Sequence, residues 1–135
     1  LKYELRQDTG GAGRKRGGLG IRRDYEILSN SASLSFVADR CIFGANGLAE
    51  GRAGGVGTYL IDRGDGPKLA SPDFVSKGTQ ISLKKGDIIS QCTAGGGGYG
   101  KPEDRNENEI LKDLRLGYIS KTEAVETYGI KSKKI

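Results

Sequence analysis

The stretch SASLSFVAD, residues 31–39, decides the fold class of this 135-residue chain. Ala32, Leu34, Phe36 and Ala38 alternate there with a second set of residues that are mostly serine. A period of two is typical of a β-strand with one apolar and one polar face. The serine face is expected to meet solvent or a second layer of the protein.

Similar short stretches recur through the first hundred residues, with turn signals between them. They cover residues 1–6, 21–28, 58–63, 79–83 and 88–93. Three connections are predicted to reverse the chain: Ser29-Asn30, which would pair residues 27–28 with 32–34, the GDG turn at 64–66, and the KKGD hairpin at 84–87. Two longer loops cover residues 7–20 and 40–57. About six to eight short strands of this kind predict an antiparallel sandwich or a barrel-like domain.

The pattern becomes helical after Gly100. Apolar residues within 103–116 have helical spacing, and Gly117 is the expected stop. Ser120 followed by Glu123 is a capping-box pattern for a second helix that ends at Gly129. We therefore expect a glycine-rich all-β part over 1–102, a C-terminal helical pair over 103–130 that packs on it, and a basic tail over 131–135.

The composition excludes several kinds of chemistry. The chain has no histidine, which removes imidazole bases, Ser-His-Asp and Cys-His pairs and histidine-ligated metals. Its two cysteines cannot complete a four-thiolate site. Glycine takes 23 of 135 positions, against about 7 % in average proteins, which favours many turns and close backbone contacts. The absence of an apolar run of about 18 residues argues against a transmembrane helix. No leader peptide is visible, and a start at Leu1 indicates a processed chain or an excerpt.

Residues 93–102, TAGGGGYGKP, contain the first candidate site. Gly95, Gly97 and Gly100 have the spacing G-x-G-x-x-G, and Lys101 adds most of the G-x-x-x-x-G-K spacing of a phosphate loop. Such loops bind anions through backbone N–H groups at a helix start. Pro102, however, stands where a hydroxyl should ligate Mg²⁺. The alternative is a close backbone crossing against a partner. The predicted interface or anion contacts are Gly95, Gly96, Gly97, Gly98 and Tyr99.

The second candidate is the cationic loop tip Arg14, Lys15 and Arg16, which is also a predicted interface or anion contact. With Arg22 and Arg23 it could contact a phosphate backbone in a small basic nucleic-acid-binding module. Such modules usually add aromatic residues for stacking, and this loop has none. A solvated or partner-facing loop is the alternative.

Scattered carboxylates form the third candidate, because a pair of them could do acid–base work. They are Asp39, Glu50, Asp62, Asp65 and Asp87. Asp65 and Asp87 follow glycine in turn-like contexts, which favours turn roles for both.

The glycine-rich motifs, taken in order, resemble one family. Residues 4–20, ELRQDTGGAGRKRGGLG, are similar to the pattern E-L-R-x-D-S/T-G-G-x-G-x-x-R-G-G-x-G of hydantoinase B/oxoprolinase proteins. Further matches in the same order are Asp39-Arg40, Gly47-Leu48, Gly51-Arg52, Ser76-Lys77-Gly78, Gly86-Asp87, the run from Gly95 to Gly100 with Pro102, and Tyr128-Gly129. The chain departs from the family at Lys101, Glu50 and residues 41–43.

This resemblance implies the C-terminal domain, or a separately encoded small subunit, of a hydantoinase B-like component. In that family the B component works with an ATP-binding A component, and together they hydrolyse hydantoins or 5-oxoproline with ATP. Related members carboxylate ketones. ATP, Mg²⁺ and a divalent metal are thus implied for the whole assembly. The family's metal ligands lie elsewhere and use His and Asp. We expect no catalytic, cofactor-binding or metal-binding residue in this chain, and a structural and assembly role in the cytoplasm.

Overall fold

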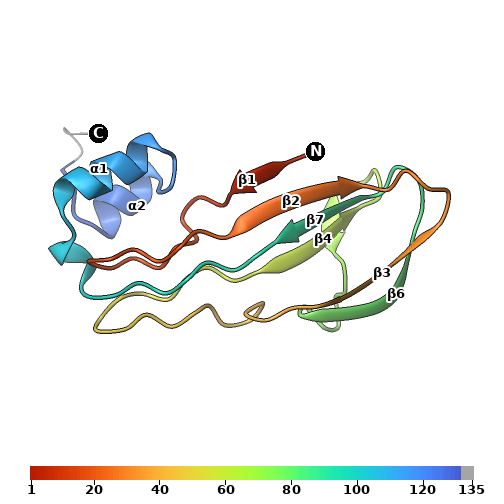
Figure 1. The fold of residues 1–135 in the computed structure, drawn as a ribbon, viewed down its shortest axis with the longest axis horizontal. Coiled ribbons are helices and arrows are strands. Elements are labelled where there is room, and N and C mark those ends of the chain that lie inside the picture. The colour runs from red at the N-terminus through yellow and green to blue at the C-terminus, as the bar shows by residue number, and fades with distance from the viewer. Residues whose placement is uncertain (132–135) are drawn as a thin grey trace.

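The computed structural model describes residues 1–131 and has a mainly β fold (Figure 1). The strands are β1 Tyr3–Leu5, β2 Ile21–Glu26, β3 Ala32–Val37, β4 Thr58–Asp62, β5 Pro67–Leu69, β6 Lys77–Leu83 and β7 Ile88–Cys92. A short 3₁₀ helix, η1 Pro102–Asp104, precedes the α-helices α1 Glu107–Arg115 and α2 Lys121–Glu126. The predicted combination of short antiparallel strands and two C-terminal helices is confirmed. Residues 132–135 of the predicted basic tail lie outside the described residues.

The strands form two antiparallel sheets, and within residues 1–131 they close no barrel. The larger sheet has the order β1-β2-β7-β4-β5, and the smaller one pairs β3 with β6. The ring of Phe36 on β3 stacks on that of Tyr59 on β4, with centroids 4.5 Å apart. This aromatic pair joins the two sheets, as two layers of a sandwich require.

Strand β3 has the alternation that its sequence predicts. Ala32, Leu34 and Phe36 are half-buried, while the residues between them are exposed. The serine side of the strand therefore faces outward.

Two of the three predicted chain reversals do not form hairpins. Strand β2 pairs with β1 and β7, and β3 pairs with β6, so the predicted pairing of 27–28 with 32–34 is wrong. The turn at 84–87 does form, because the Asp87 N–H donates to the Lys84 carbonyl at 3.1 Å, but it joins strands of different sheets. Only the GDG turn makes the predicted antiparallel pair, β4 with β5. The alternation of apolar and polar residues determines which face of a strand is buried. It does not determine which other strand it pairs with.

Three glycine-rich segments continue outward from the ends of the strands and run side by side (Figure 1). They cover residues 7–20, 40–57 and 93–100, and we call them the glycine block. Successive residues in the block donate to different neighbours: the Gly95 N–H to Gly55, the Gly96 N–H to Gly18. The Gly98 N–H donates to the same segment as the Gly95 N–H, so the pattern repeats every three residues. A strand inside a β-sheet would instead alternate between its two neighbours every two residues. Segments of about three residues per turn, as in polyproline II helices, have this property.

The spacing within the block leaves no room for side chains at many glycines. An ideal Cβ built on Gly95 would lie 1.7 Å from the Thr9 carbonyl oxygen, and one on Gly98 would lie 2.1 Å from that of Ala12. These values are far below any contact that a real Cβ makes. Glycine is needed here for close backbone approach, since neither residue has a positive φ.

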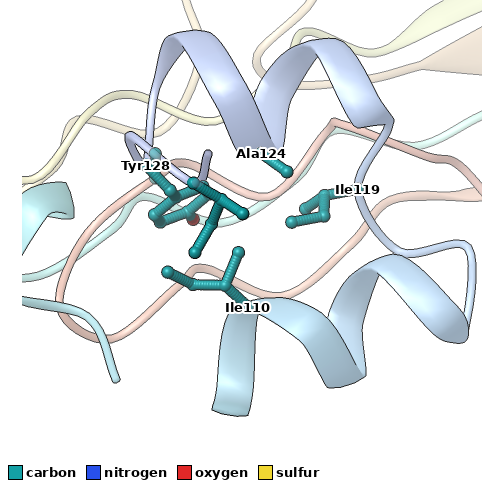
Figure 2. Close-up of a cluster of buried hydrophobic side chains, with 6 residues drawn as sticks. Ile110, Ile119, Ala124 and Tyr128 are labelled. Carbon is teal, nitrogen blue, oxygen red and sulfur yellow. The ribbon is translucent and has the colours of Figure 1, made fainter. Parts of the chain in front are cut away.

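The helical pair covers one side of the glycine block and contains the main apolar core (Figure 1). In Figure 2, Ile110 of α1, Ile119 of the connection and Ala124 and Tyr128 from α2 and its end converge between the two helices. Ala12 of the glycine block, 3 % exposed, belongs to the same cluster. The helices thus provide the block with an apolar contact that glycine cannot make.

The helix ends follow their sequence signals with one correction. The predicted helix over 103–116 divides into η1 and α1, and α1 begins only after Asn106, whose side chain accepts the Asn108 N–H. The Ser120 hydroxyl accepts the Glu123 N–H, as the capping-box pattern predicts. Gly117 and Gly129 have φ of +72° and +71°, the left-handed conformation that ends a helix.

Candidate functional site

The four consecutive glycines 95–98 lie inside the glycine block. Three of their N–H groups donate to main-chain carbonyls at 2.9 Å: Gly95 to Gly55, Gly96 to Gly18 and Gly98 to Arg52. A phosphate loop needs such N–H groups to point into an open concavity. Here these donors are used within the chain, so the segment serves as a packing element between the other two segments.

Tyr99 joins all three segments at the outer end of the block. Its main chain exchanges two hydrogen bonds of 2.9 Å with Lys15, and the neighbouring Gly98 and Gly100 bind Leu48. Tyr99 is 48 % exposed, and the Arg14 guanidinium lies 5.8 Å from the centroid of its ring. The outer end therefore presents a tyrosine, a leucine and two exposed cations from segments far apart in the sequence.

The third predicted cation, Arg16, turns inward. Its Nε lies 2.8 Å from Asp113 Oδ2 on α1, and the Arg105 guanidinium binds the same oxygen at 2.8 Å. The Arg16 side chain is 13 % exposed, and those of Asp113 and Arg105 are each 8 % exposed. We call this ion triad the helix clamp, because it ties α1 to the glycine block.

The sequence pattern alone did not single out Asp113 or Arg105. The signal that could have found Asp113 is its spacing from Ile110, which places a carboxylate three residues on along the inward face of the helix. A buried carboxylate needs a cation, and Arg16 and Arg105 supply two. Arg105 also lies 6.0 Å from the centroid of the Tyr128 ring, and burial raises the pKa of that tyrosine.

A tight turn closes the middle segment of the block. The Gly51 N–H donates to the Leu48 carbonyl at 3.0 Å, with Ala49 and Glu50 between them at φ of 50° and 70°. Two left-handed residues define a type I′ turn, for which Asn-Gly is the preferred sequence. The Glu50 carboxylate lies 3.4 Å from Lys101 Nζ, and both side chains are exposed.

Three of the other predicted carboxylates, Asp62, Asp65 and Asp87, have structural partners. Asp87 is 2 % exposed and accepts the Lys84 N–H at 3.0 Å, which confirms its turn role, and Arg63 lies 3.4 Å from the same oxygen. Asp65 is exposed and pairs with Lys68, which lowers the pKa of its carboxyl. It is Asp62 that accepts the N–H groups of the GDG turn, at 2.8 and 3.1 Å.

Ionisable groups elsewhere are also held by structural contacts. Asp24 accepts two hydrogen bonds from Arg22 at 2.8 and 2.9 Å, and this arginine lowers the pKa of Asp24. Cys41 and Cys92 are free thiols, and burial raises the pKa of Cys41, so its thiol is a poor nucleophile at neutral pH. Within residues 1–131, no three His, Cys, Asp or Glu side chains come together to hold a metal.

The predicted contact residues divide into two groups. Arg14, Lys15 and Tyr99 lie at the surface, whereas Arg16 and glycines 95–98 make contacts within the molecule. In the part of the chain that the structure describes, no helix is long and apolar enough to span a membrane.

Comparison with known proteins identifies the family. The sequence profile of the hydantoinase B/oxoprolinase family matches residues 1–102. The chain belongs to the hydantoinase B/oxoprolinase family. The profile covers all seven strands and the glycine block, and it ends where η1 begins.

Relatives match beyond the family profile, along nearly the whole chain. An uncharacterised protein of Methanocaldococcus jannaschii is 42 % identical over 131 residues, which are 97 % of this chain and 22 % of that protein. The B component of a putative D-/L-hydantoinase from a Pseudomonas species (strain NS671) is 32 % identical over 96 % of this chain and 21 % of its own length.

A solved structure has the same fold. The crystal structure of the ATP-dependent caprolactamase from Pseudomonas jessenii matches 98 % of this chain and 23 % of its own, with a TM-score of 0.77 and 27 % identity. This family member therefore spans about a fifth of the length of the relatives that it matches.

Proposed function

We propose that this chain is the C-terminal domain, or a separately encoded equivalent, of the hydantoinase B-like component of an ATP-dependent cyclic amidase. The observation that carries the proposal is how much of each chain is aligned. The match covers 96–98 % of this chain but only 21 % of the hydantoinase component and 23 % of the caprolactamase chain. A match of this kind supports one part of a larger catalyst.

In this proposal the chain braces the assembly and supplies no reacting group. Residues 1–102 form its glycine-rich β part, and residues 103–130 form the helical pair that supports it. The sequence has no histidine. Most buried polar side chains that could do acid–base work, such as Asp87 and Asp113, are committed to arginines or to turns.

ATP, Mg²⁺ and a divalent metal would be bound elsewhere in the assembly. The residues of this chain do not fit ATP, because the N–H donors of Gly95, Gly96 and Gly98 are used internally and Pro102 replaces the hydroxyl ligand of Mg²⁺. They do not fit a metal either, since no cluster of suitable ligands forms within residues 1–131. The partners are the remainder of the B-like component and an ATP-binding A-like subunit, and we place the assembly in the cytoplasm.

Reconstitution tests this function. The remainder of the B-like component and the A-like subunit are combined with and without this chain, and phosphate release from ATP is measured with hydantoin, 5-oxoproline or caprolactam. We expect amide-dependent phosphate release only when this chain is present, and none from the chain alone. Turnover by the isolated chain, or full turnover without it, would overturn the proposal.

Two further arms of the experiment address the alternatives. Replacement of the amide by a ketone and bicarbonate identifies a carboxylase of the same family. A salt series with DNA and RNA tests the basic-module hypothesis, because contacts with phosphates weaken steeply as salt rises. The structure reduces the cations available for this role, since Arg16 is largely buried and pairs with Asp113.

A further inference from the structure

An exposed row of large apolar side chains follows the chain from the end of β3 into the glycine block. Val37 is 88 % exposed, Ile42 66 % and Phe43 81 %, and Phe74, just before β6, is 59 % exposed. We call these four residues the apolar strip. Together they expose roughly 500 Å² of side-chain surface, estimated from ordinary side-chain areas. That is near the upper end of what an ordinary monomer leaves open.

The strip follows two adjoining grooves. Phe36, Val37, Phe74 and Ile81 line one groove of about 500 Å³. Ile42 and Phe43, with Ala38 and Ser76, line the second, of about 440 Å³. The grooves meet where β3 ends, because the Ala38 N–H donates to the Ser76 carbonyl at 2.8 Å and Val37 pairs with Lys77. The two grooves, and the four side chains that follow them, therefore adjoin at the end of β3.

The charges around the strip do not favour a charged partner. Asp39, Arg40 and Lys77 line its grooves, with both signs present. A nucleic acid or an acidic peptide would need a surface of one sign. Exposed aromatic and branched apolar residues are instead typical of a permanent interface, which resembles a domain core cut in two.

We propose that the apolar strip is the surface on which the remainder of the hydantoinase B-like component packs. This inference rests on the proposed function. The occupant follows from length: the matched relatives carry about four times as much additional polypeptide as this chain provides, in the same protein. A permanent apolar interface within one component fits that situation better than an interface with a dissociating partner.

The test measures binding of the tagged 135-residue chain to the remainder of the B-like component. The variants are Phe43→Ser and Val37→Ser, and the matched control is Leu28→Ser. Leu28 is 75 % exposed and lies outside the strip, in the connection between β2 and β3. Because all three side chains are exposed, each variant is expected to keep the urea midpoint of the unmodified chain.

We expect Phe43→Ser to weaken binding by at least about 30-fold and Val37→Ser by about tenfold, as for truncations at the centre of an interface. Leu28→Ser should change it by less than about threefold. If the unmodified chain binds and the strip variants bind equally well, the strip proposal is wrong and the proposed function stands. If the unmodified chain does not bind, both are wrong.

Two other binding results would assign the apolar strip to a different occupant. Self-association of the chain that Phe43→Ser abolishes would assign the strip to a second copy. Binding to the A-like subunit that the same variant abolishes would assign it to that subunit. Either result overturns the proposal, because it commits the strip to the B-like component.

Discussion

Substitution of Gly17 by alanine tests the packing of the glycine block directly. An ideal Cβ at Gly17 would lie 2.0 Å from the Gly96 carbonyl oxygen, so that oxygen must move by at least 1 Å to reach even a tight 3.0 Å contact. The same oxygen accepts the Gly11 N–H at 2.8 Å, and a movement of that size breaks this hydrogen bond. Overpacking costs about 1–3 kcal/mol, and disturbance of the Gly11 bond and the adjoining Gly96 N–H bond to Gly18 costs about 1 kcal/mol each. The expected loss is about 3–5 kcal/mol.

The neighbouring residue provides the matched control. A Cβ at Gly18 would meet nothing within 4 Å, and the φ of Gly18 is outside the left-handed region. Gly18→Ala is therefore expected to change stability by less than about 1 kcal/mol. Urea unfolding followed by circular dichroism should show the Gly17→Ala midpoint about 2 M lower, whereas Gly18→Ala should be nearly unchanged. Equal midpoints for the two variants would refute the close-packed block.

Three further predictions concern charges and strain. Asp113→Ala leaves Arg16 buried without its carboxylate partner. The free energy of unfolding in urea is therefore expected to fall by about 3–5 kcal/mol. A fall of less than about 1 kcal/mol would contradict the helix clamp. Glu50→Gly relieves a φ of 70°, so the urea midpoint should rise by an amount equivalent to about 1 kcal/mol, and a lower midpoint would show that the turn is unstrained. Because Arg22 lowers the pKa of Asp24, their contribution is present above about pH 4 and is lost as the pH falls through the lowered pKa. Asp24→Asn should thus be less stable than the unmodified chain at pH 7 and converge with it toward pH 2, and a constant difference would contradict this.

The sequence predicted what depends on neighbouring residues. The alternation of 31–39 gave the buried and exposed faces of β3, and Ser120, Gly117 and Gly129 marked helix ends correctly. Each of these features depends only on residues that are a few positions apart in the sequence. The partner of β3 is not, because β6 begins forty residues after β3 ends. A local turn signal such as Ser29-Asn30 is compatible with a hairpin and equally with a crossing between sheets.

The candidate site shows the same limit at the level of chemistry. The glycine density indicated close backbone contacts. The alternative prediction for Gly95–Gly98 was a close crossing against a partner, whereas the crossing that the structure shows lies within the chain. The acceptors of these N–H groups could not be predicted from the sequence, because they belong to residues as distant as Gly18 and Gly55. Arg16 looked equivalent to Arg14 in the sequence, and only the position of Asp113 on α1 separates an internal ion pair from an exposed cation.

The glycine block also explains why the helical pair is needed. A segment of glycines has almost no apolar side-chain surface to bury, so its cohesion depends on main-chain hydrogen bonds that each contribute little net free energy. Ala12 provides a link to an apolar core, and that core is made mainly by the two helices and the residues that follow them. Arg16 adds an ionic link to the same helices through Asp113. The block and the helical pair therefore stabilise one another, so we expect neither part to fold stably without the other.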